Sequence, residues 1–273
     1  MPPFFTRLLS QGLCSGALLL SGCATVVNLP PRPTAATETL SATESTAAWA
    51  RVLARFVNQQ GEVDFAALAA DPIDLNHYLH YIAQRPLDGF DSDAQRLAHM
   101  INAYNALSMF NVIESGIPAT HAGTAKISFF VLRKLRIGGR ELSLYAFEND
   151  VIRPYARARQ DPRIHFALNC SALACPVLPR RPFTAAALDA ELEREARAFF
   201  ALPGNFRIDT AAQTLWLSEI LNFYPEDFVP VPAPSLLAYA NRYAPQAAPA
   251  DFRVRFTPYD WTVANSRRRR EGP

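Results

Sequence analysis

The sequence has little lysine and little net charge for its length. Only two of its 27 basic residues are lysines, Lys126 and Lys134. The net charge is +2 over 273 residues. Four of the basic residues are the consecutive arginines 267–270, so the rest of the mature chain has a slight excess of acidic residues. A nucleic-acid-binding protein carries a basic patch or stripe. The charge balance therefore excludes nucleic acid as an expected partner.

Several sequence motifs are also missing. There is no glycine-rich phosphate loop, no pair of carboxylates at a recognisable catalytic spacing and no internal repeat. We therefore expect no cofactor. The chain is 49% hydrophobic and 19% charged, which excludes a disordered protein. Its length is sufficient for one large domain with a well-buried core.

A short apolar segment opens the chain. In residues 1–22, Arg7 precedes an apolar run that is broken by polar residues and ends in Leu-Ser-Gly. The run is too short to span a bilayer and is typical of a signal peptide. With Cys23 it resembles a bacterial lipobox, which implies a lipoprotein anchored in the cell envelope through acyl chains such as palmitate on Cys23. Ala24 favours the outer membrane, facing the periplasm. The alternative is an ordinary secreted protein with a chance cysteine.

Composition divides the rest of the chain into three parts. Residues 23–46 are rich in threonine, alanine, serine and proline, which predicts a flexible tether behind the lipidated cysteine. Residues 47–264 carry the patterns of a globular domain, and residues 265–273 form an arginine-rich tail. Helices and short strands follow one another without regular βαβ alternation. We predict a single α+β domain, helix-rich, with a small and mostly antiparallel sheet.

The most distinct predicted element is a helix over residues 94–115. Its apolar positions cover much of the circumference, so we expect it to be central. Extended segments are predicted at residues 127–135, 141–144, 163–170, 206–209 and 214–218. The segment 163–170 is predicted to be a buried strand leading into a loop that ends at Pro176.

Four segments together resemble a known family. They are Ile-Asn-Ala-Tyr-Asn-Ala-Leu at 101–107, Leu-Ser-Leu at 142–144 with Glu148 and Arg153, residues 161–176 from Asp-Pro-Arg-Ile-His-Phe-Ala-Leu-Asn-Cys to Ala-Cys-Pro, and Pro-Tyr-Asp-Trp at 258–261. In this order they resemble the domain of unknown function 547 family, DUF547, which occurs in bacterial envelope proteins. The resemblance covers roughly residues 49–264. Because the family has no established activity, it implies boundaries and candidate residues and no reaction.

Cys170 and Cys175 allow three interpretations. They could close a disulfide in an oxidising periplasm. Cys170 could instead be a nucleophile assisted by His165. Thirdly, His165, Cys170 and Cys175 could ligate a metal, but their spacing fits no standard zinc pattern and no fourth ligand is evident. We therefore expect no metal.

The spacing of His165 and Cys170 argues against a simple dyad. On one regular strand, residues five positions apart face opposite sides and lie about 17 Å apart. A direct contact between them requires a bulge or a sharp turn. Asp260, from the 258–261 segment, could supply an orienting carboxylate to His165 from another element.

Asn102 and Asn105 lie three positions apart on one face of the predicted central helix. Buried amides need hydrogen-bond partners. These two could clamp neighbouring backbone, including the loop after residue 170, or one could polarise a substrate carbonyl.

Two functions follow from these residues. The first is a cell-envelope hydrolase or acyl transferase that uses Cys170 as a thiol nucleophile on a peptide or amide bond. His165, Asn102, Asn105 and Asp260 would assist it. The second is a non-catalytic lipoprotein that binds a peptide or another envelope component and uses the Cys170–Cys175 loop structurally. In both, the membrane is a partner through Cys23.

Overall fold

The computed structural model describes residues 24–30 and 41–267. The predicted signal peptide, Cys23 and most of the arginine-rich tail lie outside the described residues. Within the described ranges, no helix combines the length and the apolar character that crossing a bilayer requires.

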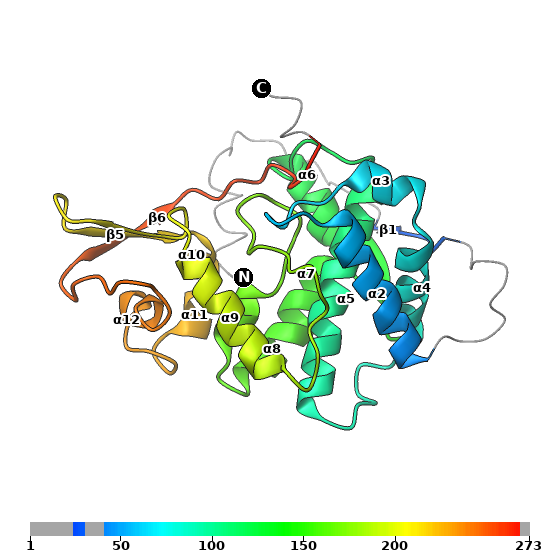
Figure 1. The fold of residues 1–273 in the computed structure, drawn as a ribbon, viewed down its shortest axis with the longest axis horizontal. Coiled ribbons are helices and arrows are strands. Elements are labelled where there is room, and N and C mark those ends of the chain that lie inside the picture. Colours follow the sequence, from blue (N-terminus) through cyan, green and yellow to red (C-terminus); the bar gives the residue numbers. More distant parts are fainter. Residues whose placement is uncertain (1–23, 31–40, 268–273) are drawn as a thin grey trace, which may run out of the picture.

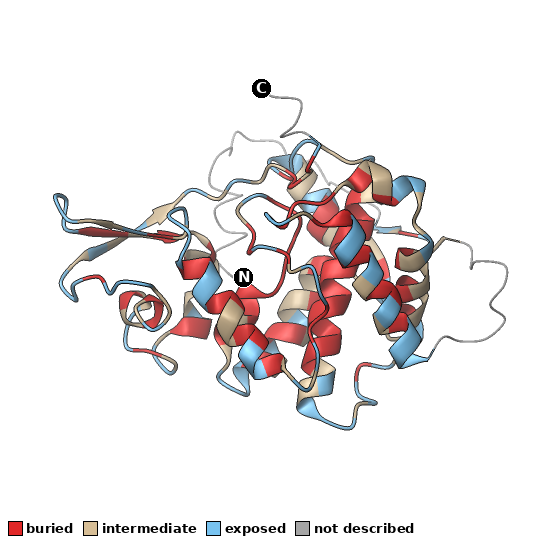
Figure 2. Ribbon diagram, viewed as in Figure 1, coloured by how far each residue is buried: buried red, intermediate tan, exposed pale blue. Residues whose placement is uncertain are grey.

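Four helices form the right half of the molecule in Figure 1. They are α2 (Ala42–Phe56), α3 (Phe65–Ala70), α4 (Ile73–Gln84) and α5 (Asp93–Glu114). Three of them begin at side-chain caps, with Ser41, Asp64 and Ser92 accepting from backbone N–H groups in the first turn. Helix α5 is buried at every position from Leu97 to Val112, as the red ribbon in Figure 2 shows. The predicted central helix is confirmed.

A small mixed sheet packs beside these helices. It has the order β1 (Thr25–Val26), β2 (Arg133–Ile137) and β3 (Arg140–Leu142). Strand β1 runs parallel to β2, and β3 runs antiparallel to it. The prediction of an extended segment over 127–135 was wrong in its first half. There the chain forms α6 (Thr124–Ile127) and the π-helical turn η1 (Ser128–Leu132), which bury Phe129 and Phe130.

Two parts of the predicted tether are ordered against the domain. Val27 is 5% exposed, and the Pro30 carbonyl lies 2.9 Å from His80 Nε2. Further on, α2 starts at Ala42, inside the predicted tether. Burial of apolar side chains stabilises both parts, and the Ser41–Glu44 capping box also stabilises the start of α2. The folded part therefore begins earlier than residue 47.

The middle of the chain is a series of short helical turns. In order these are α7 (Leu144–Ala146), η2 (Phe147–Ile152), α8 (Arg153–Arg157) and the 3-10 helix η3 (Pro162–Phe166). The prediction of a strand over 163–170 was wrong. Pro162 stands at the first helical position, and the Asp161 side chain accepts from Arg163 N at 3.2 Å. This cap starts a helical turn where apolar content alone suggested a strand.

The other half of the molecule contains a second three-stranded sheet. Strands β4 (Phe206–Asp209) and β5 (Thr214–Ser218) form the predicted antiparallel hairpin, and β6 (Arg253–Thr257) lies parallel to β5. The helices of this half are α9 (Leu188–Phe200), α10 (Ile220–Phe223), α11 (Pro225–Phe228) and α12 (Leu236–Ala240). The α+β class is confirmed. However, the strands form two sheets, and each has one parallel and one antiparallel pairing.

The buried side chains form two hydrophobic clusters. One surrounds α5 and the first sheet, and the other lies between α9, the second sheet and α12. Tyr259 packs against both clusters. The segment after η3 joins the two: Phe166 belongs to the second cluster, and Ala167 and Leu168 belong to the first. The candidate site lies at this junction.

Candidate functional site

A pocket opens where the two clusters meet. Its empty volume is about 540 Å³, part of it open to solvent. Seven of its fourteen lining residues are Phe, Tyr or Trp: Tyr104, Phe130, Tyr145, Phe223, Tyr224, Tyr259 and Trp261. Its chemically active lining consists of Glu148, His165, Cys170 and Cys175. These residues come from several elements, so only the folded chain assembles them.

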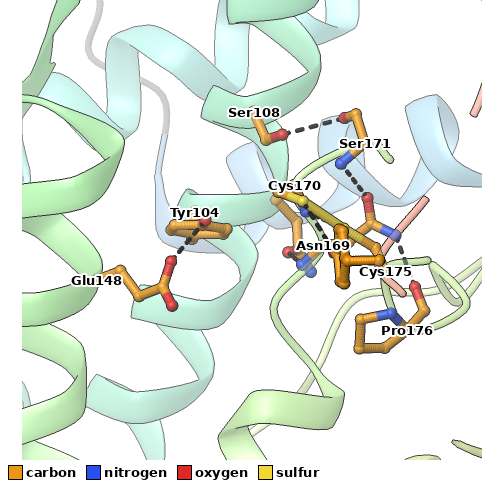
Figure 3. The surroundings of a disulfide bond; sticks show 10 residues. Tyr104, Ser108, Glu148, Asn169, Cys170, Ser171, Cys175 and Pro176 are labelled. Carbon is orange, nitrogen blue, oxygen red and sulfur yellow. Dashed lines mark hydrogen bonds between the residues drawn. A yellow bond between two sulfur atoms is a disulfide. The ribbon is translucent and has the colours of Figure 1, made fainter. Parts of the chain in front are cut away.

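The two cysteines are joined by a disulfide (Figure 3). Each is 9% exposed. The Cys175 sulfur accepts from the Cys170 backbone N–H at 3.0 Å and from the Tyr259 hydroxyl at 3.0 Å. The Cys170 sulfur has only the Tyr259 hydroxyl, at 3.4 Å. Burial, followed by the charges of Glu148 and Asp260, raises the pKa of Tyr259, so this phenol stays protonated and donates.

Asparagine side chains hold the backbone of the disulfide loop. Asn105 Nδ2 donates to the Ala167 carbonyl at 3.0 Å, and its Oδ1 accepts from Asn169 N at 2.7 Å. Asn169 in turn donates to the Pro176 carbonyl and accepts from Ser171 N, each at 2.7 Å (Figure 3). Both polar ends of each amide are used by backbone. The expectation that Asn105 clamps the loop is confirmed.

Asn102 clamps a different segment. Its Nδ2 donates to the Phe183 carbonyl at 2.8 Å, and its Oδ1 accepts from Phe183 N at 3.0 Å and from Trp49 Nε1 at 3.3 Å. Asn102 does not line the pocket with the disulfide. Its side chain therefore clamps backbone outside this pocket, which does not place it to polarise a substrate carbonyl there.

His165 pairs with Asp227 and not with Asp260. His165 Nε2 lies 2.8 Å from Asp227 Oδ2, and the ring stacks on Tyr224 at 4.9 Å between centroids. Asp260 is exposed, and its carboxylate accepts from Thr262 N at 2.9 Å. The structure therefore brings His165 into the pocket wall but leaves Asp260 away from it.

Asp227 is the centre of a buried charge cluster. It also accepts from Arg153 Nε at 2.7 Å and from the Arg157 guanidinium. Burial alone would raise the pKa of this carboxyl, but the hydrogen bonds and charges of His165 and Arg153 outweigh burial and hold the pKa well below its ordinary value. A permanently ionised Asp227 fixes the orientation of the His165 ring.

Glu148 is the second carboxylate of the site and the one that faces the pocket. It projects from η2 and accepts from the Tyr104 hydroxyl at 2.8 Å (Figure 3). Burial, together with the charge and hydrogen bond of Glu148, raises the pKa values of Tyr104 and Tyr224. Both phenols therefore stay protonated, and Tyr104 donates to this carboxylate.

The resemblance noted in the sequence is borne out by a family model. Residues 88–200 match the family described as protein of unknown function, DUF547. This segment is a DUF547 match. It includes three of the four segments that carried the resemblance, and the fourth, residues 258–261, lies beyond it. The DUF547 match contains Tyr104, Glu148, His165 and both cysteines, whereas Asp227 and Tyr259 come from the chain after it. No curated protein and no solved structure matched the chain.

Three features of the site were not predicted from the sequence. They are the pairing of Asp227 with His165, the contact of the Tyr259 hydroxyl with the two sulfurs, and the position of Glu148 in the pocket wall. Asp227 lies 62 positions from His165, on the short helix α11. A Pro-Glu-Asp-Phe helix start is a frequent local pattern and gave no signal. In the described part of the chain, no group of three or more His, Cys, Asp or Glu side chains is arranged to hold a metal ion.

Proposed function

We propose that the protein is a thiol-dependent hydrolase or acyl transferase of the bacterial cell envelope, anchored through a lipid on Cys23, and that its active site is the pocket at the junction of the two clusters. One observation carries the proposal: the Cys170–Cys175 disulfide, the His165 ring and the Glu148 carboxylate all line this one pocket, and Asp227 holds the His165 ring from behind the wall. Perturbed titratable groups that gather in a cleft are a functional-site signal, and in this pocket burial raises the pKa values of the Tyr104, Tyr224 and Tyr259 phenols.

The disulfide is the oxidised resting state in this proposal. A dithiol reductant supplies two electrons and two protons by thiol–disulfide exchange, which leaves one thiol on each cysteine. The hydrogen bonds to the sulfurs favour Cys175 as the thiolate, because its sulfur has two donors at 3.0 Å and that of Cys170 has one at 3.4 Å. The nucleophile proposed from sequence, Cys170, is then the residue that reforms the disulfide.

The chemical step is acyl transfer. The thiolate attacks the carbonyl carbon of an amide, an S–C bond forms, and the C–N bond breaks as the amine leaves with a proton from the His165 imidazolium. Water or a second amine then attacks the thioester carbon, a C–O or C–N bond forms as the S–C bond breaks, the cysteine leaves as the thiolate, and the proton of the attacking group returns to His165. Within the described residues no hydrogen bond joins His165 to either sulfur. We place His165 as the acid and base of the leaving and entering groups.

Alkylation kinetics test the proposal. The reduced protein is treated with iodoacetamide near neutral pH, and the modified cysteine is mapped by mass spectrometry. We expect fast alkylation of one cysteine, Cys175, and slower alkylation in a Tyr259→Phe variant, which loses the hydroxyl donor. Cys170→Ser should still react fast and Cys175→Ser should not. Slow, equal alkylation of both cysteines would overturn the assignment.

Acyl-enzyme formation tests the chemistry itself. The reduced protein is mixed with p-nitrophenyl acetate, and the acetylated residue is identified by mass. Acetylation of Cys175 that is absent in Cys175→Ser supports the proposal. Absence of acetylation in the reduced wild-type protein contradicts it.

A second candidate function is a non-catalytic binding lipoprotein. The observation that favours it is the closed disulfide in a loop whose backbone is clamped by Asn105 and Asn169. This function predicts that the disulfide resists reduction under native conditions. Thiol titration of the folded protein, with and without reductant, separates the two candidates.

A further inference from the structure

Glu148 is an ionisable group whose partners are all neutral. Its hydrogen-bond donor is the phenol of Tyr104, and the neutral phenol of Tyr224 lies close enough for the Glu148 charge to raise its pKa. Among the described residues, no lysine, arginine or histidine forms an ion pair with it. Arg153, five positions later in the chain, is directed instead to Glu226 and Asp227.

The contrast with Asp227 shows what is missing at Glu148. The Asp227 carboxylate is surrounded by the cationic groups of Arg153 and Arg157 and by His165. Both carboxylates lie within the fold near the same pocket, but only one of them is compensated. A partly buried carboxylate is stabilised most by a positive partner. Of these two carboxylates, Glu148 is therefore the one without a cationic partner among the described residues.

The rest of the wall also favours a cation. Aromatic ring faces attract ammonium groups when the charge lies within about 6 Å of the ring centre. The molecule already uses two of these rings in this way. Lys126 Nζ lies 3.6 Å from the Trp261 ring centroid, and Arg153 Cζ lies 4.0 Å from the Tyr224 ring centroid. The rings of Tyr145, Phe223 and Tyr259 complete the wall. An anionic ligand would meet the Glu148 charge and the negative ring faces together.

We propose that this pocket binds a primary ammonium group, held between the Glu148 carboxylate and the aromatic wall. A primary ammonium has three N–H donors, which match the carboxylate and phenol oxygens. What this binding implies about the substrate rests on the proposed function. The substrate is an amide or peptide that carries a primary ammonium close to the bond that is cleaved, because Glu148 and the cysteines line the same pocket.

The first experiment measures binding without chemistry. A Cys170→Ser/Cys175→Ser variant is titrated with n-propylammonium, n-propanol and propionate, and binding is followed by saturation-transfer NMR. We expect n-propylammonium to bind and the neutral and anionic analogues of similar size to bind much more weakly. Equal binding of the three probes would overturn the inference.

Substitutions on the same background locate the site. Glu148→Gln keeps the shape and removes the charge, and we expect it to weaken n-propylammonium binding about tenfold or more. Tyr145→Leu removes one ring of the wall, with an expected loss of about two- to fivefold. Glu141→Gln, an exposed glutamate on β3, is the matched control and should leave binding unchanged. Unchanged binding in Glu148→Gln contradicts the site. If that variant unfolds at a lower temperature, the Tyr145→Leu result still decides.

The binding and the chemistry can fail separately. Ammonium binding by the double-serine variant, without acetylation of the reduced wild-type protein, refutes the acyl-transfer proposal and leaves the ammonium site standing. Acetylation of Cys175 without preferential binding of n-propylammonium refutes the ammonium site and leaves the acyl-transfer proposal standing.

Discussion

His121 provides a direct test of how burial controls the pH stability of this fold. Its side chain is 0% exposed, its ring centroid lies 3.9 Å from that of Phe129, and Phe130 is edge-on at 5.9 Å. Neither ring nitrogen has a hydrogen-bond partner among the described residues. Burial is the main cause that lowers the pKa of His121 to about 4. The imidazole is therefore neutral in the folded protein near neutral pH.

The sign of the effect follows from proton binding. In the unfolded chain a histidine has a pKa near ~6.5, so between about pH 6.5 and pH 4 the unfolded state binds more protons than the folded state. Stability is therefore complete above about pH 6.5 and falls as the pH drops toward 4. With these two pKa values, His121 removes about 2 kcal/mol from the free energy of unfolding on going from about pH 7.5 to about pH 5.

The assay is urea denaturation of wild-type protein and His121→Phe at these two pH values, with the disulfide intact. We expect the wild-type protein to lose about 2 kcal/mol more than the variant between them. Every other titrating group, including the buried His99, contributes equally to both proteins and cancels. His77→Phe, which removes a partly exposed histidine of α4, is the control. An equal pH loss in wild type and His121→Phe would refute the reasoning.

Three further substitutions test packing and hydrogen bonding by the same denaturation assay. Asp227→Asn removes the buried one of the two carboxylates that pair with Arg153 and should cost about 3–5 kcal/mol, and a loss below about 1 kcal/mol would contradict the charge cluster. Asn105→Ala removes both clamps on the segment before the disulfide and should cost about 1–3 kcal/mol; equal alkylation rates of the reduced variant and wild type would show that the loop does not depend on it. Gly61→Ala should destabilise by about 1–3 kcal/mol because Gly61 has φ +76° and its added Cβ would lie 2.6 Å from Leu178 N, whereas a neutral substitution would mean that this close approach relaxes freely.

The elements that could be predicted are those whose signal is contained in their own residues. Helix α5 repeats apolar residues around its circumference, and its observed range of Asp93–Glu114 differs by one residue at each end from the predicted 94–115. The 206–218 hairpin alternates and turns locally, and it forms as expected. The clamping role of Asn105 followed from two facts, an amide on a buried helix face and the requirement that it be paired.

The prediction of a strand over residues 163–170 was wrong for a physical reason. Its apolar content fits a buried strand or a buried helical turn equally well, because hydrophobicity reports burial and not backbone geometry. The deciding feature is the preceding Asp161-Pro162 pair, which caps and starts a helical turn. The distance argument against a His165–Cys170 dyad assumed a regular strand, so it does not apply to the folded chain, in which both residues line one pocket.

The site itself could be predicted only in part, because its polar partners meet across the junction of two hydrophobic clusters. His165, Cys170 and Cys175 are close in sequence, and their grouping is visible in the residues alone. Their partners Asp227 and Tyr259 come from the second half of the chain, 62 and 84 or more positions away. No periodicity connects such positions, since only tertiary packing brings them together. The Glu148 carboxylate was visible in the sequence, but its lack of a cationic partner is a property of the folded pocket. That missing charge is what assigns the site an ammonium ligand.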